Sequence, residues 1–478
     1  MRLERPHSYR SRAFLVVLVC LMTACGGARK DIAPLVSSTS PTGQKVLIVG
    51  IDGATFSVLD PLIAQGRAPQ LKALIDKGAR GVLRSLNPTA SPAIWTTIAT
   101  GREPRDHGIT DFTVTRWKGF RRERVLVSDN ERRTQALWNM LGPFGKSAGF
   151  VGWWASWPAE PVRGWMISDR MTQSRFTEWM HGNRQEFLTF PADLEMELRP
   201  LVVDPLHAPL PEIRALVDLS DEEQAEFEAA SRPIFAHGLS VFKFAYSEQR
   251  SYEEIALHML SAAQPDLTGV FLVANDPVCH TFWHFYQPSK FRGVDPGKAE
   301  RLGRIIPNLY EHNDRYLSEL MKRIDPETTV FVVSDHGFEA SGEVPVPRSR
   351  AGFSRWFDAE KSKAMKEGTV AVGQSGRHNL DGILIVSGGS IRRGVEVRAS
   401  VLDIAPTILA LLGLPVARDM EGRVLKEIIE PGFLARHPIR TIDSYEEYIP
   451  RVNVPETDEG SEADHARLQA LRSLGYVQ

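Results

Sequence analysis

The chain has 478 residues, of which 42% are hydrophobic and 24% are charged, a composition that excludes a disordered or fibrous protein and provides enough material for a large core or for two to three domains. The 57 lysines and arginines nearly balance the 59 aspartates and glutamates, so the formal net charge is only -2. No overall field therefore attracts a nucleic acid polymer or an anionic membrane, and a charged substrate must be captured locally.

Residues 1–25 are predicted to form an export signal. Several arginines precede the apolar run AFLVVLVCLMTA, and small residues follow it. This order is typical of a secretory signal, and the run is shorter than the ~20 residues of a membrane-spanning helix. The end of the run, LMTAC, resembles the lipobox of bacterial lipoproteins, in which Cys25 would be lipidated. The alternative is a signal that is cleaved without lipidation. In both cases we expect an exported protein of the bacterial cell envelope, facing the periplasm if it is a lipoprotein.

A tether is expected next, over residues 26–43, which are rich in Gly, Ser, Thr and Pro. The main α/β domain is predicted over residues 44–179 and 263–435. Five apolar runs of strand length occur in it, and helical patterns lie between them, for example over residues 300–324. Strands that alternate with helices predict an α/β fold with a mainly parallel central sheet and helices on both faces. The five runs are KVLIVGI, AGFVGWW, LTGVFLVAN, TVFVVS and DGILIVSGG.

Three segments depart from this alternation. Residues 180–262 are polar, acidic and helical in character, and we interpret them as a cap inserted over the edge of the sheet. Residues 339–376 form a second polar excursion. The tail, residues 436–478, ends in ARLQALRSLGYVQ, whose leucine stripe predicts a docking helix, with a free partner-binding helix as the alternative. Cys279 is the one cysteine outside the leader region, so the body has no internal disulfide.

Three of the predicted strands end in an aspartate: Asp52, Asp276 and Asp335. The carboxyl ends of parallel strands form the ligand-binding edge of an open α/β sheet, so these carboxylates should converge on one crevice. Carboxylates at close range repel one another and raise each other's pKa. A bound cation would relieve this repulsion.

Histidines accompany these acids. His336 adjoins Asp335, His280 follows Asp276 by one helical turn, and His378 precedes the last apolar run. Imidazole and carboxylate ligands suit Zn²⁺ or Mn²⁺ better than Ca²⁺ or Mg²⁺, and we favour Zn²⁺. Taken singly, each acid could cap a turn and each histidine could be a hydrogen-bonded loop residue; the joint pattern favours a metal site. Cys279 is expected to be a packed thiol.

The triplet Asp-His-Gly occurs twice, at Asp106 and at Asp335. The copy at Asp106 follows a polar turn with no strand before it, so its side chains need not reach the sheet edge. The copy at Asp335 ends a strand. We therefore predict that Asp335 and His336, and not Asp106 and His107, belong to the site.

A nucleophile is indicated in the segment PTASPAIWTTIATG. Ser91 stands directly before Pro92, a residue favoured at the first position of a helix, and serine is favoured at the cap before it. Ser91 should therefore lie at a helix N-terminus, where backbone N–H groups and the helix dipole attract phosphate. The alternative is that Ser91 is simply an N-cap.

Taken together, GIDGATF, PTASPAIWTTIATGREPRDHGI, NDPVCH, SDHGF and RHNLDGILIVSG resemble the type I phosphodiesterase and nucleotide pyrophosphatase family of the alkaline phosphatase superfamily, in the order in which that family carries its motifs. The resemblance covers most of residues 45–415 and implies an alkaline-phosphatase-like fold. It also implies two divalent metal ions, with Ser91 at the position of the family's nucleophile. The implied ligands are Asp52, Ser91, Asp335 and His336 for one ion and Asp276, His280 and His378 for the other.

The implied activity is metal-dependent hydrolysis of phosphate esters through a phosphoseryl intermediate, with a phosphodiester favoured. The substrate would be a small molecule or an ester linked to a lipid or glycan. Phe112 stands where nucleotide-cleaving relatives carry an asparagine, which argues against a nucleotide substrate. Pro92 directly follows Ser91 and no arginine of a sulfatase motif follows, which argues against a sulfatase. The alternatives are a phosphomonoesterase, a phospho-group transferase, or a metal-stabilised interaction protein without activity.

Overall fold

The computed structural model describes residues 29–38, 41–118, 120–172, 186–230, 238–341, 374–452, 454 and 468. The predicted leader with Cys25 lies outside these residues. So do most of the polar excursion at 339–376 and the docking helix predicted at the C-terminus, except for Leu468, which is buried in the core.

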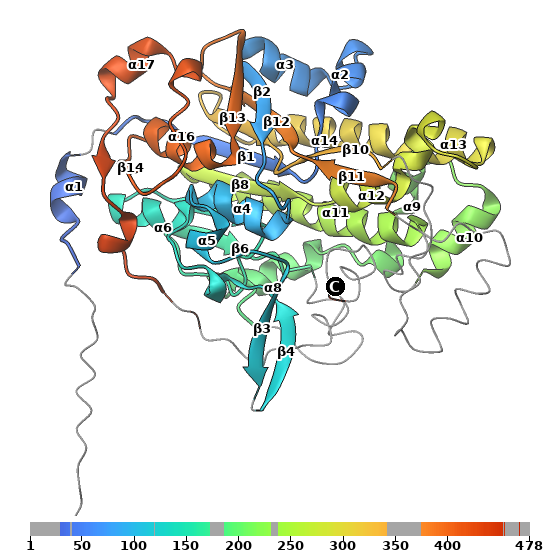
Figure 1. Cartoon of the computed structure of the whole chain (residues 1–478), viewed down its shortest axis with the longest axis horizontal. Helices are drawn as coiled ribbons and strands as arrows, with labels where there is room; N and C mark the ends of the chain where they lie inside the picture. Colours follow the sequence, from blue (N-terminus) through green and yellow to red (C-terminus); the bar gives the residue numbers. More distant parts are fainter. Residues whose placement is uncertain are drawn as a thin grey trace, which may run out of the picture.

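A nine-stranded sheet forms the centre of the molecule, in the order β13-β2-β12-β9-β1-β8-β5-β6-β7 (Figure 1). β12 and β7 run antiparallel to their neighbours, and the other strands all run in one direction. The predicted mainly parallel α/β sheet is thus confirmed, and each of the five apolar runs contains a strand. The strands are β1 (Val46–Ile51), β2 (Ala79–Arg84), β5 (Ala148–Val151), β6 (Gly164–Ile167), β7 (Thr189–Phe190), β8 (Leu267–Leu272), β9 (Thr329–Val333), β12 (Asp381–Ser387) and β13 (Val395–Ser400).

Helices cover both faces of this sheet (Figure 1). The helix predicted over residues 300–324 is divided at Gly303, where a Cβ atom would lie 2.5 Å from the carbonyl oxygen of Phe285. The helices are α1 (Ala33–Ser38), α2 (Phe56–Ala64), α3 (Pro69–Lys77), α4 (Ser91–Thr100), α5 (Pro104–His107), α6 (Leu137–Leu141), α8 (Leu194–Leu198), α9 (Leu210–Leu216), α10 (Asp221–Ala229), α11 (Gly238–Ala262), α12 (Asn275–Tyr286), α13 (Pro296–Leu302), α14 (Ile305–Met321), α16 (Ile404–Leu411) and α17 (Pro431–Arg436).

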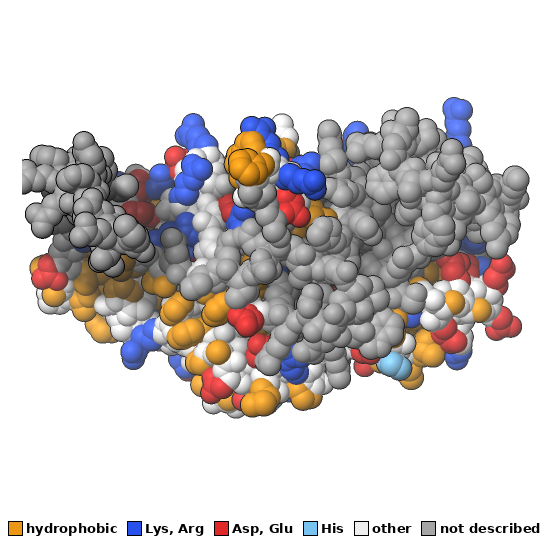
Figure 2. Space-filling view, turned by 90° about the horizontal axis from the view of Figure 1, so that it is seen from below, with side chains coloured by type: hydrophobic (Ala, Val, Ile, Leu, Met, Phe, Trp, Pro, Cys, Tyr) orange, Lys and Arg blue, Asp and Glu red, His pale blue; other side chains and the backbone are white. Residues whose placement is uncertain are grey.

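Three two-stranded sheets lie outside the central one. The hairpin of β3 (Thr113–Lys118) and β4 (Arg121–Leu126) projects from the body (Figure 1). Figure 2 views the molecule from the side on which this hairpin projects. β10 (Gly337–Ala340) pairs with β11 (Gly376–Asn379) and packs against α12, while β14 (Val416–Ala417) pairs with β15 (Thr441–Ile442).

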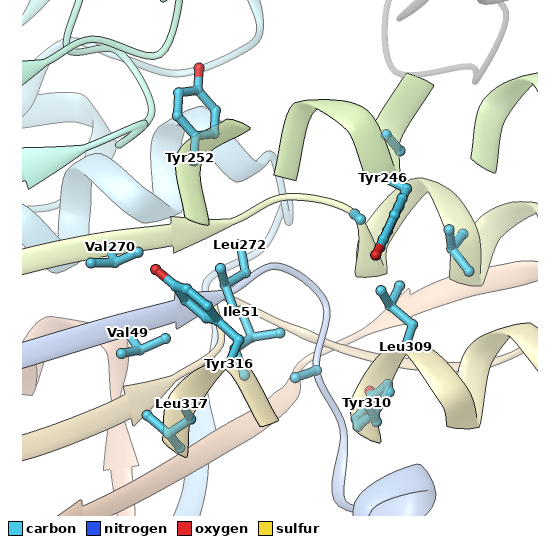
Figure 3. Packing of buried hydrophobic residues seen from close by; sticks show 14 of the residues in the cluster. Val49, Ile51, Tyr246, Tyr252, Val270, Leu272, Leu309, Tyr310, Tyr316 and Leu317 are labelled. Carbon is cyan, nitrogen blue, oxygen red and sulfur yellow. The ribbon is translucent and has the colours of Figure 1, made fainter. Parts of the chain in front are cut away.

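Alternate residues of each central strand face two separate hydrophobic cores, as expected for a sheet buried on both faces. On β1, Val46 and Ile48 belong to the core that includes α4, α6 and α16, whereas Leu47 and Val49 belong to the core beneath α11, α12 and α14. Figure 3 shows the second core, with Tyr316 and Leu317 of α14 packed beside Val49 and Ile51 of β1.

The segment interpreted as a cap is divided between two roles. β7 adds the last strand to the central sheet, and α11 packs directly on β8 and α12 within the helical layer. Helices α8, α9 and α10 carry the rest of the described segment. α11 joins the helical layer instead of forming part of a cap because it has an apolar face, whose buried residues include Phe242, Tyr246 and Ile255.

The expected tether also makes contacts with the body. α1 lies within residues 26–43, and the Lys30 Nζ atom is 2.7 Å from a carboxylate oxygen of Glu447. Among the described residues, no helix combines the length and the apolar character needed to cross a bilayer.

Candidate active site

The three strand-end aspartates meet at one edge of the sheet. Asp52 follows β1, Asp335 follows β9, and Asp276 lies in the first turn of α12, which begins shortly after β8. β1 pairs in parallel with both β8 and β9, so these strands end at the same edge. All three carboxylates are buried. The histidines come from α12, from the β9–β10 junction and from β11, and they form two groups of possible metal ligands with these acids.

The first group consists of Asp276, His280 and His378. The His378 Nε2 atom lies 3.0 Å from Asp276 Oδ1 and 2.8 Å from His280 Nε2, and the His280 Nε2 atom lies 3.4 Å from the same carboxylate oxygen. The His280 Nδ1 atom faces the carbonyl oxygen of Gly376 at 2.9 Å, and His378 Nδ1 faces oxygen atoms of Thr89. We therefore assign the ring protons to Nδ1, which leaves two Nε2 lone pairs and a carboxylate directed at one point. A cation at that point would offset the repulsion between the two lone pairs and the carboxylate.

The second group consists of Asp52, Asp335 and His336. The His336 Nε2 atom lies 3.3 Å from Asp335 Oδ2 and 3.5 Å from Asp52 Oδ1. Its Nδ1 atom faces the carbonyl oxygen of Gly337 at 3.2 Å, so Nε2 again carries the lone pair. Among the described residues, neither His336 Nε2 nor Asp335 Oδ2 has a hydrogen-bond partner, although both atoms are buried. Such orphaned polar atoms are costly, and a metal ion would satisfy them.

The two groups are adjacent, since His336 Nε2 lies 3.7 Å from Asp276 Oδ1 and the rings of His336 and His378 stack with their centroids 3.6 Å apart. Burial raises the pKa of Asp52 well above its ordinary value, and the charges of Asp335 and Asp276 add to this rise. Burial also raises the pKa of Asp335 to about 7. For Asp276 the opposing effect of burial is outweighed by His280 and His378, which hold its pKa well below the usual range.

These shifts show that the site tolerates negative charge poorly unless positive charge is present. Burial lowers the pKa of His336 and of His378, so both rings are held in the neutral form that binds metals. Buried neutral imidazoles and crowded carboxylates are the ligand types that Zn²⁺ and Mn²⁺ bind. The residues present therefore fit divalent cations.

Ser91 lies beside the second group. It is the first residue of α4, with Ala90 at the cap position, and its side chain makes no capping bond. The Ser91 hydroxyl is instead 3.4 Å from Asp52 Oδ1, to which it donates, and it also contacts the Asp335 carboxyl. The alternative of a simple N-cap is thus not what this structure shows. Behind Ser91, every residue of α4 is buried, which holds its N-terminus at the edge of the sheet.

Several contacts around the metal-ligand candidates were not foreseen from the sequence. The Phe338 ring packs against all three histidines, with ring centroids 4.7 Å from His280, 5.0 Å from His378 and 5.6 Å from His336. It shields that side of the histidine group from water. Gly53 makes room for the ring: its φ is +70°, and a Cβ atom there would lie 2.4 Å from the Phe338 ring. The one feature of the sequence that could have indicated this contact is the position of Phe338 directly after the Asp-His-Gly triplet.

Helix α14 supports both groups from behind. The Tyr310 hydroxyl accepts a hydrogen bond of 2.9 Å from the backbone N–H of Thr55, in the loop that carries Asp52. One turn further on, Asn313 Nδ2 donates to Asn275 Oδ1 at 2.7 Å, and Asn275 immediately precedes Asp276. Gln249 of α11 completes this network by donating to Asn313 at 2.8 Å and accepting from Ala274 N–H at 3.0 Å.

The second Asp-His-Gly triplet is placed away from both groups. The His107 Nε2 atom lies 3.0 Å from Thr97 Oγ1 of α4, and His107 Nδ1 accepts from the backbone N–H of Ile109 at 3.2 Å. Asp106 is partly exposed and forms ion pairs with Arg102 and Arg105. This copy of the triplet therefore supports the C-terminal half of α4, away from Ser91 at the N-terminus of that helix.

The aromatic residue at the asparagine position of the family also lies close to the site. Phe112 is buried against Trp154, with the ring centroids 5.6 Å apart, and the Trp154 side chain lies near the Asp52 carboxyl. Cys279 is buried in the hydrophobic core, and burial raises the pKa of its thiol. His284 is buried beside Phe285, and neither it nor Cys279 belongs to the two groups found among the described residues.

Comparison with known proteins shows the family to which the chain belongs. Residues 46–384 match the model of the type I phosphodiesterase/nucleotide pyrophosphatase family. The chain belongs to this family. It is a phosphoric ester hydrolase of a metal-dependent family within the alkaline phosphatase superfamily.

Solved structures similar to the chain include murine ectonucleotide pyrophosphatase/phosphodiesterase 5, at 12% identity, 81% coverage of this chain, 100% coverage of that chain and a TM-score of 0.46. An inactive variant of that protein in complex with AMP matches at 14% identity, the same coverages and the same TM-score. Phosphonoacetate hydrolase from Sinorhizobium meliloti in complex with phosphonoformate matches at 15% identity, covering 78% of this chain and 96% of that chain, with a TM-score of 0.42. No curated protein sequence matches the chain.

Proposed function

We propose that this hydrolase cleaves phosphate esters, with phosphodiesters preferred, through a covalent phosphoserine at Ser91. The observation that supports this most is the direction of the Ser91 hydroxyl, which points to Asp52 and Asp335 instead of capping its helix. A serine at the N-terminus of a buried helix and beside six metal-ligand candidates has the surroundings of an activated nucleophile.

Each chemical step has a residue to carry it. Divalent cations at the two groups would lower the pKa of the Ser91 hydroxyl and of a water molecule, and would neutralise phosphoryl oxygens. The Ser91 Oγ atom forms a bond to phosphorus as the ester P–O bond breaks, and the serine proton leaves toward Asp52 and ends on the released alkoxide. Water then cleaves the phosphoserine, which restores the Ser91 hydroxyl and releases the phosphate product. We propose Zn²⁺ as the cation, with Mn²⁺ as the alternative.

The surroundings of Ser91 bear on the substrate. Phe112 stands where nucleotide-cleaving relatives carry an asparagine, and its ring is packed against Trp154, so we propose a small-molecule or lipid- or glycan-linked ester that is not a nucleotide. A phosphomonoesterase and a phospho-group transferase would use the same serine. The transferase differs in passing the phosphoryl group to an alcohol instead of water.

The test is hydrolysis of bis-p-nitrophenyl phosphate and p-nitrophenyl phosphate by the chain without residues 1–25, loaded with Zn²⁺ or Mn²⁺. We expect Ser91→Ala to lower turnover on the order of 10³-fold or more, the scale of loss when a covalent nucleophile is removed. Ser85→Ala is the matched control, because Ser85 is also buried and precedes the same helix, but its hydroxyl has no hydrogen-bond partner among the described residues, whereas the Ser91 hydroxyl bonds Asp52.

Four outcomes separate the alternatives. Turnover that survives in Ser91→Ala with either metal would rule out the phosphoserine route. A faster rate with the monoester would overturn the diester preference, and transfer of the phosphoryl group to added glycerol at the expense of free phosphate would indicate a transferase. Inactivity of the wild-type protein with both metals would mean that its substrate resembles neither compound.

We further propose that the protein is exported and held at the membrane through a lipid on Cys25, facing the periplasm. The support for this is the charged, apolar and small-residue order of residues 1–25 and the LMTAC sequence. Replacing Cys25 by Ser should move the protein from the membrane fraction to the soluble periplasmic fraction. Unchanged sedimentation with membranes would exclude Cys25 as the anchor.

A further inference from the structure

The tip of the β3–β4 hairpin exposes two large aromatic side chains. Trp117 is 65% exposed near the end of β3, and Phe120 is 103% exposed in the turn that joins β3 to β4. A single exposed apolar residue needs no explanation, but two aromatic residues on one projecting turn form an apolar point that water solvates poorly. Figure 2, which faces the projecting side, shows apolar side chains flanked by lysine and arginine side chains in this part of the molecule.

The same tip is positively charged. Arg121 and Arg122 are exposed, and the Arg122 guanidinium lies over the Trp117 ring, 4.8 Å from its centroid. Glu123 is the one acid in the two strands. Arg116 and Arg124, nearer the root, are paired with Glu131 and Asp111, so the charge at the tip comes from Arg121 and Arg122 together with Lys118, which stands opposite Arg121 in the register. This local charge contrasts with the net charge of -2 of the whole chain.

The hairpin is anchored firmly at its root. Its strands pair in register from Thr113 opposite Leu126 to Lys118 opposite Arg121, and Val125 and Leu126 are buried in the body. Phe112, the residue before β3, packs on Trp154, whose side chain reaches Asp52. The root of the hairpin thus packs beside the candidate active site, while its tip projects from the body.

We propose that this tip binds the surface of an anionic phospholipid bilayer. Tryptophan and phenylalanine at a convex point can enter the headgroup region, and adjacent arginines can pair with lipid phosphates. A bilayer fits this shape because it accepts a convex tip without a complementary groove. This inference is independent of the reaction proposed at Ser91.

The test places an environment-sensitive nitrobenzoxadiazole dye at the tip of the full chain. Phe120→Cys is labelled and mixed with vesicles of phosphatidylglycerol and phosphatidylethanolamine, or of phosphatidylcholine alone. We expect the emission to shift to the blue and to rise with the anionic vesicles, and the response to weaken at high salt because charges are then screened. Met196→Cys, at a site on α8 that is 76% exposed and outside the hairpin, is the control label, and unsubstituted protein reports labelling of native cysteines.

Charge reversal at the tip gives the second measurement. Arg121→Glu with Arg122→Glu should abolish the dye response, whereas Arg392→Glu with Arg393→Glu, an exposed arginine pair in another turn, should leave it unchanged. The proposal is overturned if the dye at position 120 stays in water with anionic vesicles, if the label at 196 responds equally, or if both charge reversals act alike. Equal response to phosphatidylcholine would also overturn the requirement for anionic lipid.

Discussion

The two Asp-His-Gly triplets show how strongly the surroundings of a residue determine what it can do. Asp335 is fully buried between Asp52 and His336, whereas Asp106 lies at the surface among arginines. Removing the charge of Asp335 takes a ligand from the second group. Removing the charge of Asp106 affects partly exposed ion pairs, which are worth about 1 kcal/mol.

We therefore predict that Asp335→Asn lowers the amount of Zn²⁺ or Mn²⁺ retained after dialysis and that Asp106→Asn does not. Elemental analysis of both variants and of the wild-type protein is the measurement. Equal losses in the two variants would show that the wrong triplet has been assigned to the site.

Among the secondary-structure elements, α14 connects the halves of the site. Tyr310 holds the loop after β1 and Asn313 holds the start of α12, so one helix positions acids from both metal-ligand groups (Figure 3 shows Tyr310). The bonds from Gln249 to Asn313 and from Asn313 to Asn275 are buried, and an unpaired buried polar group costs about 1–3 kcal/mol.

Asn313→Ala should accordingly lower the free energy of unfolding by roughly that amount, measured by urea denaturation with a chelator present, and should weaken metal binding in calorimetry. The matched control is Asn308→Ala on the same helix, because Asn308 bonds Arg67 and Leu216 and not α12. If Asn308→Ala weakens metal binding as much as Asn313→Ala, α14 does not position the site through Asn313.

For the molecule as a whole, the buried His107 makes stability depend on pH. Burial, with a contribution from the charge of Arg132, lowers the pKa of His107 to about 3, although Asp106 partly opposes this. An unfolded histidine takes up a proton near pH 6.5. Between these values the unfolded state binds more protons than the folded state, so stability is complete above pH 6.5 and falls as the pH is lowered toward 3.

Urea denaturation of wild type and His107→Gln between pH 4.5 and 7.5 measures this effect. The free energy of unfolding of the wild type should decrease more steeply on acidification, by up to about 1.4 kcal/mol per pH unit relative to the variant. Parallel curves for the two proteins would mean that His107 is not kept neutral by the fold.

Much of the architecture and the identity of the metal-ligand candidates could be read from the sequence. The apolar runs are local signals, and β1, β5, β8, β9 and β12 lie where they predict. An aspartate after a parallel strand belongs to the ligand-binding edge by a general rule, so Asp52, Asp276 and Asp335 could be named as convergent without coordinates. The division of the ligands into two sets came from the resemblance to a family, and the structure brings the same residues together in two groups.

Tertiary structure alone decided what surrounds these residues. Thr89 meets His378 across 289 positions of sequence, and Asn313 meets Asn275 across 38, so no local pattern announces either contact. The antiparallel direction of β12, the place of α11 in the helical layer and the packing of Phe338 among the histidines also depend on how distant elements pack. Local periodicity reports which face of an element is buried, whereas the partner on that face is selected by the packing of the whole chain.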